Sequence, residues 1–271
     1  MVDKTILITG ATDGIGEQTA LELAGNGASI LLHGRNIQKA EKSLDKIIRL
    51  TSNDRIKAFI ADFSSLNGVK KLADEIKQNN NNLDVLINNA GVYMNQEKIT
   101  VDGFETTFQV NHLAPFLLTH LLLPLLNNVH SRIINVSSVA HTRGRIDFDN
   151  LNGEKFYDAY NAYALSKLAN VIFTVELAER LKGTGITVNA LHPGVINTKL
   201  LRTGFSIMGG SVERGAETSV YLATSSEVEG ITGRYFEKKR QSSFNSIAKD
   251  EYIRKKFWEI SEQMTGIEKY L

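Results

Sequence analysis

Short apolar runs alternate along the chain with longer stretches in which apolar residues recur at helical spacing. Most of these runs are continuous and do not alternate with polar residues, which is typical of strands buried on both faces of a parallel sheet. We predict strands at residues 5–9, 29–33, 56–60, 85–88, 132–137, 187–191 and 233–236. We predict helices at residues 16–25, 38–50, 66–78, 101–126, 156–182, 212–224 and 246–264.

Strands that alternate with helices indicate right-handed βαβ units. The fold class that we expect is α/β: a single Rossmann-like, doubly wound domain over residues 1–271, with a mainly parallel sheet of about seven strands and helices on both faces. Two stretches without a clear period, 139–155 and 196–211, follow predicted strands. Because ligands bind beyond the carboxyl ends of such strands, we expect both stretches to wall a substrate pocket. The alternative is that they are ordinary surface loops.

Composition and charge exclude several functional classes. Hydrophobic residues make up 42% of the chain and charged residues 23%, which is ordinary for a globular protein with a large core. The net charge of +1 does not favour a nucleic-acid partner, and the absence of cysteine excludes disulfides and thiolate metal sites. The most apolar stretch, 116–126, contains His120 and Pro124 and is too short to span a bilayer. We therefore expect a cytoplasmic protein without a membrane anchor.

A glycine-rich turn joins the first predicted strand to the first predicted helix. Gly10, Gly14 and Gly16 lie in this turn with the spacing G-x-x-x-G-x-G. A strand, a glycine turn and a helix N-terminus together form a phosphate site, because the free N–H groups and the helix dipole attract anions. In this interpretation Gly10 permits the tight turn, Gly14 lets the backbone approach a pyrophosphate, and Gly16 allows close packing of helix and sheet. A glycine-rich turn without a ligand is the alternative.

The end of the second predicted strand distinguishes between the two nicotinamide cofactors. A carboxylate there binds the ribose of NAD, whereas an arginine pairs with the 2′-phosphate of NADP. No acidic residue occurs between Glu22 and Glu41, and the strand is followed by Arg35 and Asn36. NADP is therefore favoured over NAD. Asp13 in the glycine turn argues the other way, because its charge would repel the 2′-phosphate.

Three tyrosines have a lysine four residues later: Tyr163/Lys167, Tyr235/Lys239 and Tyr252/Lys256. This spacing places two side chains on one face of a helix. Tyr235 begins in a predicted strand, where the same spacing separates the two residues by about 13 Å. Tyr252 lies in a highly charged helix, for which a solvated face is expected. Only Tyr163 lies on a long, largely apolar helix, so Tyr163 and Lys167 are the candidate pair.

A lysine beside a tyrosine favours the phenolate, and we expect Lys167 to lower the pKa of Tyr163. A shift from ~10 to near neutrality requires about 4 kcal/mol, which one cation at ~4 Å supplies in an effective dielectric of ~20. The positive nicotinamide ring would add to this effect. A phenol with such a pKa is suited to general acid–base catalysis.

Several motifs occur together in one order over most of the chain: the turn at residues 9–16, Asp62-Phe63, Asn88-Asn89-Ala90-Gly91, Asn111, Ser137-Ser138, Tyr163/Lys167 and Pro193-Gly194. This set resembles the short-chain dehydrogenase/reductases. Within that family, the runs at 110–113, 135–141, 166–171, 192–195 and 233–236 are most similar to retinol dehydrogenases and related carbonyl reductases. The resemblance implies a homodimer or homotetramer, in which the predicted helix at 156–182 pairs across a two-fold axis.

The resemblance also implies roles for individual positions. Tyr163 is the expected acid/base, Ser138 polarises the substrate oxygen, Lys167 binds the nicotinamide ribose, and Asn111 holds a water in the proton path. The expected cofactor-binding residues are Gly10, Thr12, Gly14, Ile15, Gly16, Arg35, Asn36, Asp62, Phe63, Asn89, Ala90, Gly91, Tyr163, Lys167, Pro193, Gly194, Ile196 and Thr198.

The remaining polar candidates are weaker. Successive strand residues face opposite sides, so only one of Ser137 and Ser138 reaches the pocket, and family register selects Ser138. His141 and His192 have no evident partner carboxylate, and we interpret both as structural or loop residues. No H-E-x-x-H pattern indicates a metal site and no G-x-S-x-G pattern indicates a serine hydrolase.

The sequence thus predicts an NADP-dependent oxidoreductase that interconverts an alcohol and a carbonyl compound. A non-catalytic NADP-binding sensor and an interaction protein on the same fold are the alternatives. Apolar residues in the expected pocket walls favour a lipophilic aldehyde or ketone: Phe148, Leu151, Phe205, Ile207 and Met208. Arg143 and Arg145 leave room for an acidic or polar substrate.

Overall fold

The computed structural model describes the whole chain except residues 1, 127–129, 206 and 268–271. Its centre is a sheet with the strand order β3-β2-β1-β4-β5-β6-β7-β8. The first seven strands are parallel and β8 pairs antiparallel with β7. The strands are β1 (Thr5–Ile8), β2 (Ser29–Gly34), β3 (Ile56–Ile60), β4 (Val85–Asn88), β5 (Arg132–Val136), β6 (Thr187–His192), β7 (Arg234–Glu237) and β8 (Arg240–Ser242).

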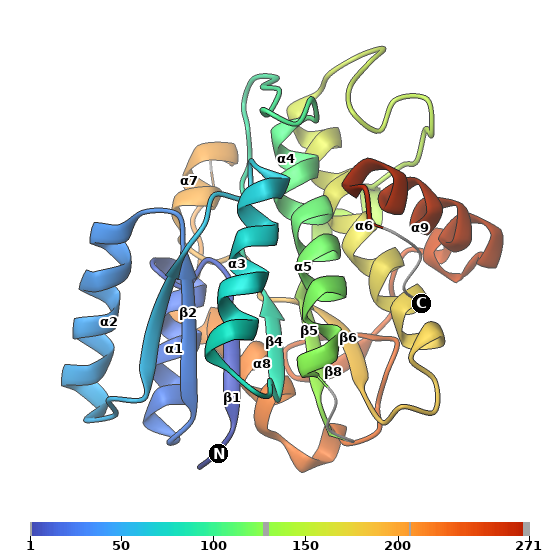
Figure 1. Cartoon of the computed structure of the whole chain (residues 1–271). Coiled ribbons are helices and arrows are strands. Elements are labelled where there is room, and N and C mark those ends of the chain that lie inside the picture. The colour runs from blue at the N-terminus through green and yellow to red at the C-terminus, as the bar shows by residue number, and fades with distance from the viewer. Residues whose placement is uncertain (1, 127–129, 206, 268–271) are drawn as a thin grey trace.

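Helices cover both faces of the sheet (Figure 1). One face carries α1 (Gly14–Gly25), α2 (Ile37–Thr51) and α8 (Val212–Thr224), whose apolar residues pack on one side of the strands. The other face carries α3 (Leu66–Asn79), α5 (Ala114–Leu122) and α6 (Ala159–Arg180), and α9 (Glu251–Thr265) packs on α6. The expected doubly wound α/β fold is therefore confirmed.

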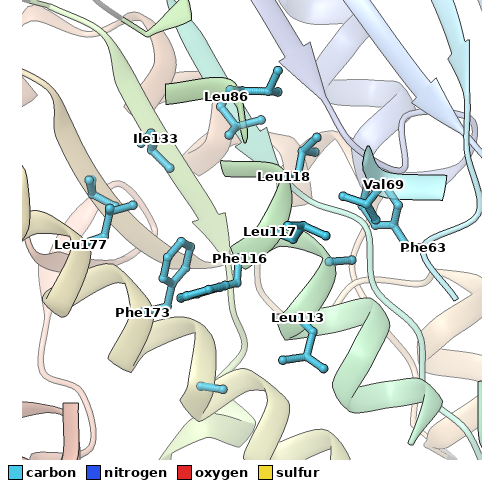
Figure 2. Close-up of a cluster of buried hydrophobic side chains, with 14 of the residues drawn as sticks. Phe63, Val69, Leu86, Leu113, Phe116, Leu117, Leu118, Ile133, Phe173 and Leu177 are labelled. Carbon is cyan, nitrogen blue, oxygen red and sulfur yellow. The ribbon is translucent and has the colours of Figure 1, made fainter. Parts of the chain in front are cut away.

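The core explains why the strand runs are continuously apolar. All four residues of β4 are buried, as are five of the six residues of β2. Phe116 of α5 and Phe173 of α6 meet between the helices and the sheet (Figure 2). With both faces covered by helices, the strands have no solvent-facing side to carry polar residues.

The predicted elements differ from the structure at several points. The helix predicted at 101–126 begins at α4 (Thr106–Phe108), where the Glu105 carboxylate accepts from the N–H groups of Thr107 and Phe108. It continues as a π-helical turn, η1 (Gln109–Leu113), then as α5, and ends in the 3-10 turn η2 (Leu123–Leu125). Pro124 in η2 has no N–H to continue an α-helical ladder.

At the C-terminal end, the helix predicted from residue 246 is a 3-10 turn, η5 (Ser246–Lys249), followed by α9. Asp250 caps α9 by accepting from the N–H of Ile253. The strand β8 was missed because its residues are polar and exposed, so it lacks an apolar signal. Both stretches expected to be aperiodic contain helix: η3 (Val139–Arg143) in the first and α7 (Lys199–Gly204) in the second.

Candidate active site

Tyr163 and Lys167 lie at the carboxyl ends of the central strands, on the buried face of α6. Tyr163 is 6% exposed and Lys167 is 3% exposed. The Lys167 ammonium is 5.6 Å from the centroid of the Tyr163 ring and donates a hydrogen bond of 3.1 Å to the carbonyl of Val136 in β5. A backbone carbonyl at the end of a strand therefore fixes the amine beneath the phenol.

The two other tyrosine–lysine pairs are not comparable sites. Tyr235 lies within β7, and Lys239 lies in the turn between β7 and β8 with a φ of 62°. Tyr252 is on α9 and is 68% exposed. As the sequence predicts, only the Tyr163/Lys167 pair lies on a long, largely buried helix.

Ser138 lies beside the phenol of Tyr163 and lowers its pKa as a hydrogen-bond partner. It caps η3, where its hydroxyl accepts from the N–H of Ala140 at 3.2 Å. The neighbouring Ser137 is buried and donates to the backbone carbonyl of Lys167 at 2.8 Å. As the alternation along a strand predicts, only Ser138 reaches Tyr163, and Ser137 ties β5 to α6.

The expected direction of the Tyr163 pKa shift is wrong. Burial is the largest cause and raises the pKa of Tyr163 to about 12, despite the lowering effect of Ser138. Burial also lowers the pKa of Lys167 to about 8. The reason is that both groups are withdrawn from water, which disfavours the charged form of each. The ammonium also lies below the ring and bonds to a carbonyl, so it does not act directly on the phenolic oxygen.

Asn111 lies in the π-helical turn η1 and is fully buried. Its amide donates to the carbonyl of Val92 and to the hydroxyl of Ser166, both at 3.0 Å, and its oxygen accepts from the N–H of Val92 at 2.7 Å. A Cβ atom on Gly91 would lie 3.3 Å from both the Asn111 oxygen and the Lys167 amine. The structure thus brings Asn111 and Lys167 to the same glycine, although they are far apart in sequence.

The glycine turn between β1 and α1 has the shape that a pyrophosphate requires. Gly10 and Gly14 have φ angles of +65° and +57°, which favour glycine. A side chain on Gly16 would collide with the carbonyl of Gly10 and the amide of Asn89. Among the described residues, the Asp13 side chain makes no capping hydrogen bond to α1. The first N–H groups of this helix therefore fit an anionic group of a dinucleotide cofactor.

Other predicted cofactor residues surround this turn. Asn89 donates to the carbonyls of Thr9 and Gly10 at 2.8 and 3.1 Å. The Thr9 hydroxyl accepts from the N–H of Ala90 at 3.0 Å. A Cβ atom on Gly14 would lie 3.4 Å from the methyl group of Thr198, so the segment after β6 closes over the turn. Pro193 and Gly194 begin that segment.

Ile15 and Ile196 lie together on the other side of the turn, where each would touch a Cβ atom placed on Gly215 of α8. Ile196 is buried. The structure therefore brings these two predicted residues into one apolar contact beside the glycine turn.

At the end of β2, Arg35 is exposed and forms no ion pair within the described residues. Thr12 of the glycine turn lies directly against Gly34, so Arg35 adjoins the turn. Asn36 caps α2 by accepting from the N–H of Lys39 at 2.9 Å. Within the described residues, a cationic residue without an ion pair thus adjoins the glycine turn.

Asp62 and Phe63 follow β3 and differ in their exposure to solvent. Asp62 is exposed, and its carboxylate accepts from the N–H of Ser64 at 2.9 Å. Phe63 is buried and stacks on His33 with 4.3 Å between ring centroids. The Phe63 ring therefore belongs to the core, and a contact of this position with the cofactor stays a prediction.

His33 is a positioning residue that the sequence pattern did not reveal. Its Nε2 donates to the carbonyl of Ala61 at 3.1 Å, so its Nδ1 accepts from the N–H of Gly10 at 3.3 Å. Burial lowers the pKa of His33 to about 4, which keeps the ring neutral and able to accept. Its partners are distant in sequence, and no local pattern identifies them.

Two aromatic side chains pack against the Tyr163 ring. Tyr93 and Phe205 lie 5.4 and 6.1 Å from it between ring centroids, and 5.2 Å from each other. Phe205, one of the predicted wall residues, therefore lies beside Tyr163, as does Tyr93, which the sequence did not indicate. The other predicted wall residues differ: Phe148 and Leu151 pack with the core, and Ile207 and Met208 are exposed.

His141 and His192 are buried, as expected for structural residues. The Nδ1 of His141 bonds to the carbonyl of Ser138 at 2.7 Å, and burial lowers the pKa of His192 to about 4. Within the described part of the chain, no cluster of three or more His, Asp or Glu side chains could hold a metal ion. The helices in that part are also all too short or too polar to cross a membrane.

Comparison with known proteins places this geometry in a family. A family model for short chain dehydrogenase matches residues 4–206. Retinol dehydrogenase 13 of Homo sapiens is 43% identical over 98% of this chain and 85% of its own length. Retinol dehydrogenase 14 of Homo sapiens is 41% identical over 98% of this chain and 88% of its own length.

Solved structures agree with the sequence relatives. An uncharacterized protein from Mycobacterium paratuberculosis has a TM-score of 0.84 and 34% identity, covering 100% of this chain and 96% of its own. A short chain dehydrogenase from Escherichia coli, complexed with NADPH, has a TM-score of 0.72 and 27% identity, covering 89% of this chain and 98% of its own. The fold, the matched segment and the relatives together show that this chain is an oxidoreductase of the short-chain dehydrogenase/reductase family, similar to the retinol dehydrogenases.

Proposed function

We propose that this protein transfers a hydride reversibly between NADP(H) and an alcohol/carbonyl pair. The observation that carries this proposal is the convergence of Tyr163, Ser138 and Lys167 at the carboxyl ends of the strands, next to the glycine turn. When bound, the nicotinamide supplies or accepts the hydride. The protein's own residues position the substrate and move the proton.

Tyr163 would donate a proton to the carbonyl oxygen during reduction. A pKa of about 12 keeps the phenol protonated at neutral pH, so it is ready to act as a donor. Ser138 lies beside it and would hydrogen-bond to the same substrate oxygen. Lys167 would bind the nicotinamide ribose, and Asn111 would hold a water that restores the proton.

The choice of NADP rests on Arg35. Arg35 adjoins the glycine turn and has no ion pair among the described residues, so its guanidinium would pair with a 2′-phosphate. Asp62 would bind the adenine edge, and Asn89, Ala90 and Gly91 would line the adenosine ribose. The NADPH complex of the similar Escherichia coli protein supports this choice.

The substrate that we propose is a lipophilic aldehyde or ketone. The aromatic side chains of Tyr93 and Phe205 beside Tyr163 support an apolar partner for the reacting carbonyl. The similarity to retinol dehydrogenases is consistent with an apolar alcohol or aldehyde.

The test is NADPH consumption over a panel of aliphatic, aromatic, steroid and retinoid carbonyls, with NADH in parallel. On the best substrate, we expect Tyr163→Phe to reduce kcat at least ~100-fold, because it removes a general acid. Tyr252→Phe, on an exposed face of α9, is the matched control and should retain full activity.

The proposal fails if Tyr163→Phe retains most of the reductase activity. Binding of NADPH without turnover on any carbonyl would instead favour a sensor. Absence of nucleotide binding would favour an interaction protein.

A further inference from the structure

A cavity of about 530 Å³ lies where η3 and the segment after it meet the first turn of α6. Its lining consists of Thr142, Arg143, Gly144, Arg145, Tyr160 and Asn161. None of these residues has a role in the hydride-transfer site described above. The cavity is open to solvent, and four of its six lining residues are exposed.

Two sets of contacts hold the backbone that carries Arg143 and Arg145. The side-chain amide of Asn245 points at the carbonyls of His141, Thr142 and Gly144, at 3.3, 3.4 and 3.3 Å. Gly144 lies so close to α6 that a Cβ atom there would be 2.7 Å from the carbonyl of Ala164. This anchoring fixes the backbone on either side of Arg143.

The two arginines of the cavity have no ion-pair partner within the described part of the chain. Arg143 and Arg145 are both exposed there, and neither forms an ion pair or a hydrogen bond through its side chain. The nearby carboxylates have other partners: Asp147 and Asp149 pair with Lys155 at 3.2 and 3.5 Å.

A third carboxylate, Asp158, accepts from the N–H of Asn161 at 2.8 Å and caps α6. None of these three carboxylates pairs with Arg143 or Arg145 among the described residues, so both guanidinium groups remain available to a ligand.

The cavity adjoins the candidate active site through Tyr160. This residue precedes Tyr163 by one helical turn, which is about 5 Å along the axis. The Tyr160 ring lies 6.2 Å from the ring of Phe205, which in turn lies 6.1 Å from the ring of Tyr163. One substrate could therefore extend along this aromatic surface from the phenol to the arginines.

We propose that the carbonyl substrate carries a carboxylate at the end remote from its reacting carbon, and that Arg143 and Arg145 bind this group. The planar guanidinium fork matches a carboxylate in two parallel hydrogen bonds. The aromatic side chains of Tyr160 and Phe205 would contact the apolar body between the two ends. This inference rests on the proposed carbonyl reduction and specifies its substrate class.

The test uses straight-chain aldehydes of increasing length that end in a carboxylate, and their methyl esters. With NADPH as cofactor, we expect the acid to exceed its ester by about tenfold in kcat/KM at the best length, as for a charge-assisted hydrogen bond. Replacing both residues, Arg143→Gln with Arg145→Gln, should abolish this preference and leave the ester unchanged. Added salt should weaken the preference in the unmodified protein.

Arg49→Gln is the matched control, because Arg49 is an exposed arginine on α2. An acid-to-ester ratio that stays the same in the double variant would overturn the proposal. The acid and the ester are compared on the same enzyme at the same NADPH concentration. A change in NADPH binding therefore affects both values and does not change the acid-to-ester ratio.

A binding measurement separates this inference from the proposed function. Calorimetry of the NADPH-bound protein with a long-chain carboxylate, and with its methyl ester, requires no turnover. Preferential binding of the carboxylate that is lost in the double variant would support the arginine site even if no aldehyde were reduced. Equal binding of acid and ester would overturn it even if aldehydes were reduced.

Discussion

At the scale of single residues, burial dominates the chemistry of the candidate site. Tyr163 and Lys167 both shift toward their neutral forms, because each is withdrawn from water. The phenol is consequently protonated at neutral pH. His33 shows the same effect in a structural role, since its neutral ring accepts from the glycine turn.

Arg35 offers a direct test of cofactor choice. We expect Arg35→Ala to lower kcat/KM for NADPH about tenfold to a hundredfold, because a charge-assisted hydrogen bond contributes roughly 1.5–3 kcal/mol. The value for NADH should change little. Steady-state kinetics with both cofactors measure the ratio, and Arg49→Ala serves as a control. An unchanged NADPH-to-NADH ratio would show that Arg35 does not contact the 2′-phosphate.

At the scale of elements, α9 completes the molecule by covering α6. Trp258 packs on Phe116 and Phe173, with 5.1 and 6.0 Å between ring centroids. The carboxylate of Glu176 in α6 is held by Arg180 at 2.9 Å and by Arg254 of α9 at 3.2 Å. Figure 1 shows α9 beside α6, and most residues of α6 are buried within the chain.

This packing bears on the expected two-fold pairing through the helix predicted at 156–182. Because α9 and the sheet cover α6, little of its surface remains for a second copy of the chain. A homodimer or homotetramer remains a prediction, and it would need to use other surfaces. Light scattering of the purified protein would measure its mass in solution.

Trp258→Ala tests the contribution of α9 to stability. Removing this buried ring should lower the free energy of unfolding by about 3–5 kcal/mol, through lost apolar contacts and a residual cavity. Tyr252→Ala, an exposed aromatic on the same helix, should change it by less than about 0.5 kcal/mol. Urea denaturation measures both. Equal effects of the two substitutions would show that α9 does not depend on its buried face.

At the scale of the whole molecule, buried histidines predict a loss of stability in acid. Burial lowers the pKa values of His33, His120 and His192 to about 4 and that of His112 to about 3, from an ordinary value of 6.5. Between about pH 4 and pH 6.5, the unfolded chain binds more protons than the folded chain, because the buried imidazoles stay neutral. The free energy of unfolding should therefore be highest above about pH 6.5 and should fall as the pH decreases toward 4.

Urea denaturation at a series of pH values measures this dependence. His192→Gln should flatten the decline, because it removes one of the buried imidazoles. A free energy of unfolding that stays constant between about pH 6.5 and 4 would contradict the prediction.

The sequence alone determined the order of strands and helices, the glycine turn, and the identity of Tyr163, Lys167 and Ser138 as candidates. These features depend on local periodicity and short spacings, which a linear pattern contains. The strand β8 and the starts of α4 and α9 were missed because polar residues and caps define them.

Only the tertiary structure decided the environment of those residues. The pKa of Tyr163, the core position of Phe63, the support of Gly10 by His33 and the arginine-lined cavity all depend on partners distant in the chain. Burial and desolvation result from the packing of the complete fold, and a single chain segment does not contain that information. The sequence thus specified which groups are present, and the packing determined their protonation and their contacts.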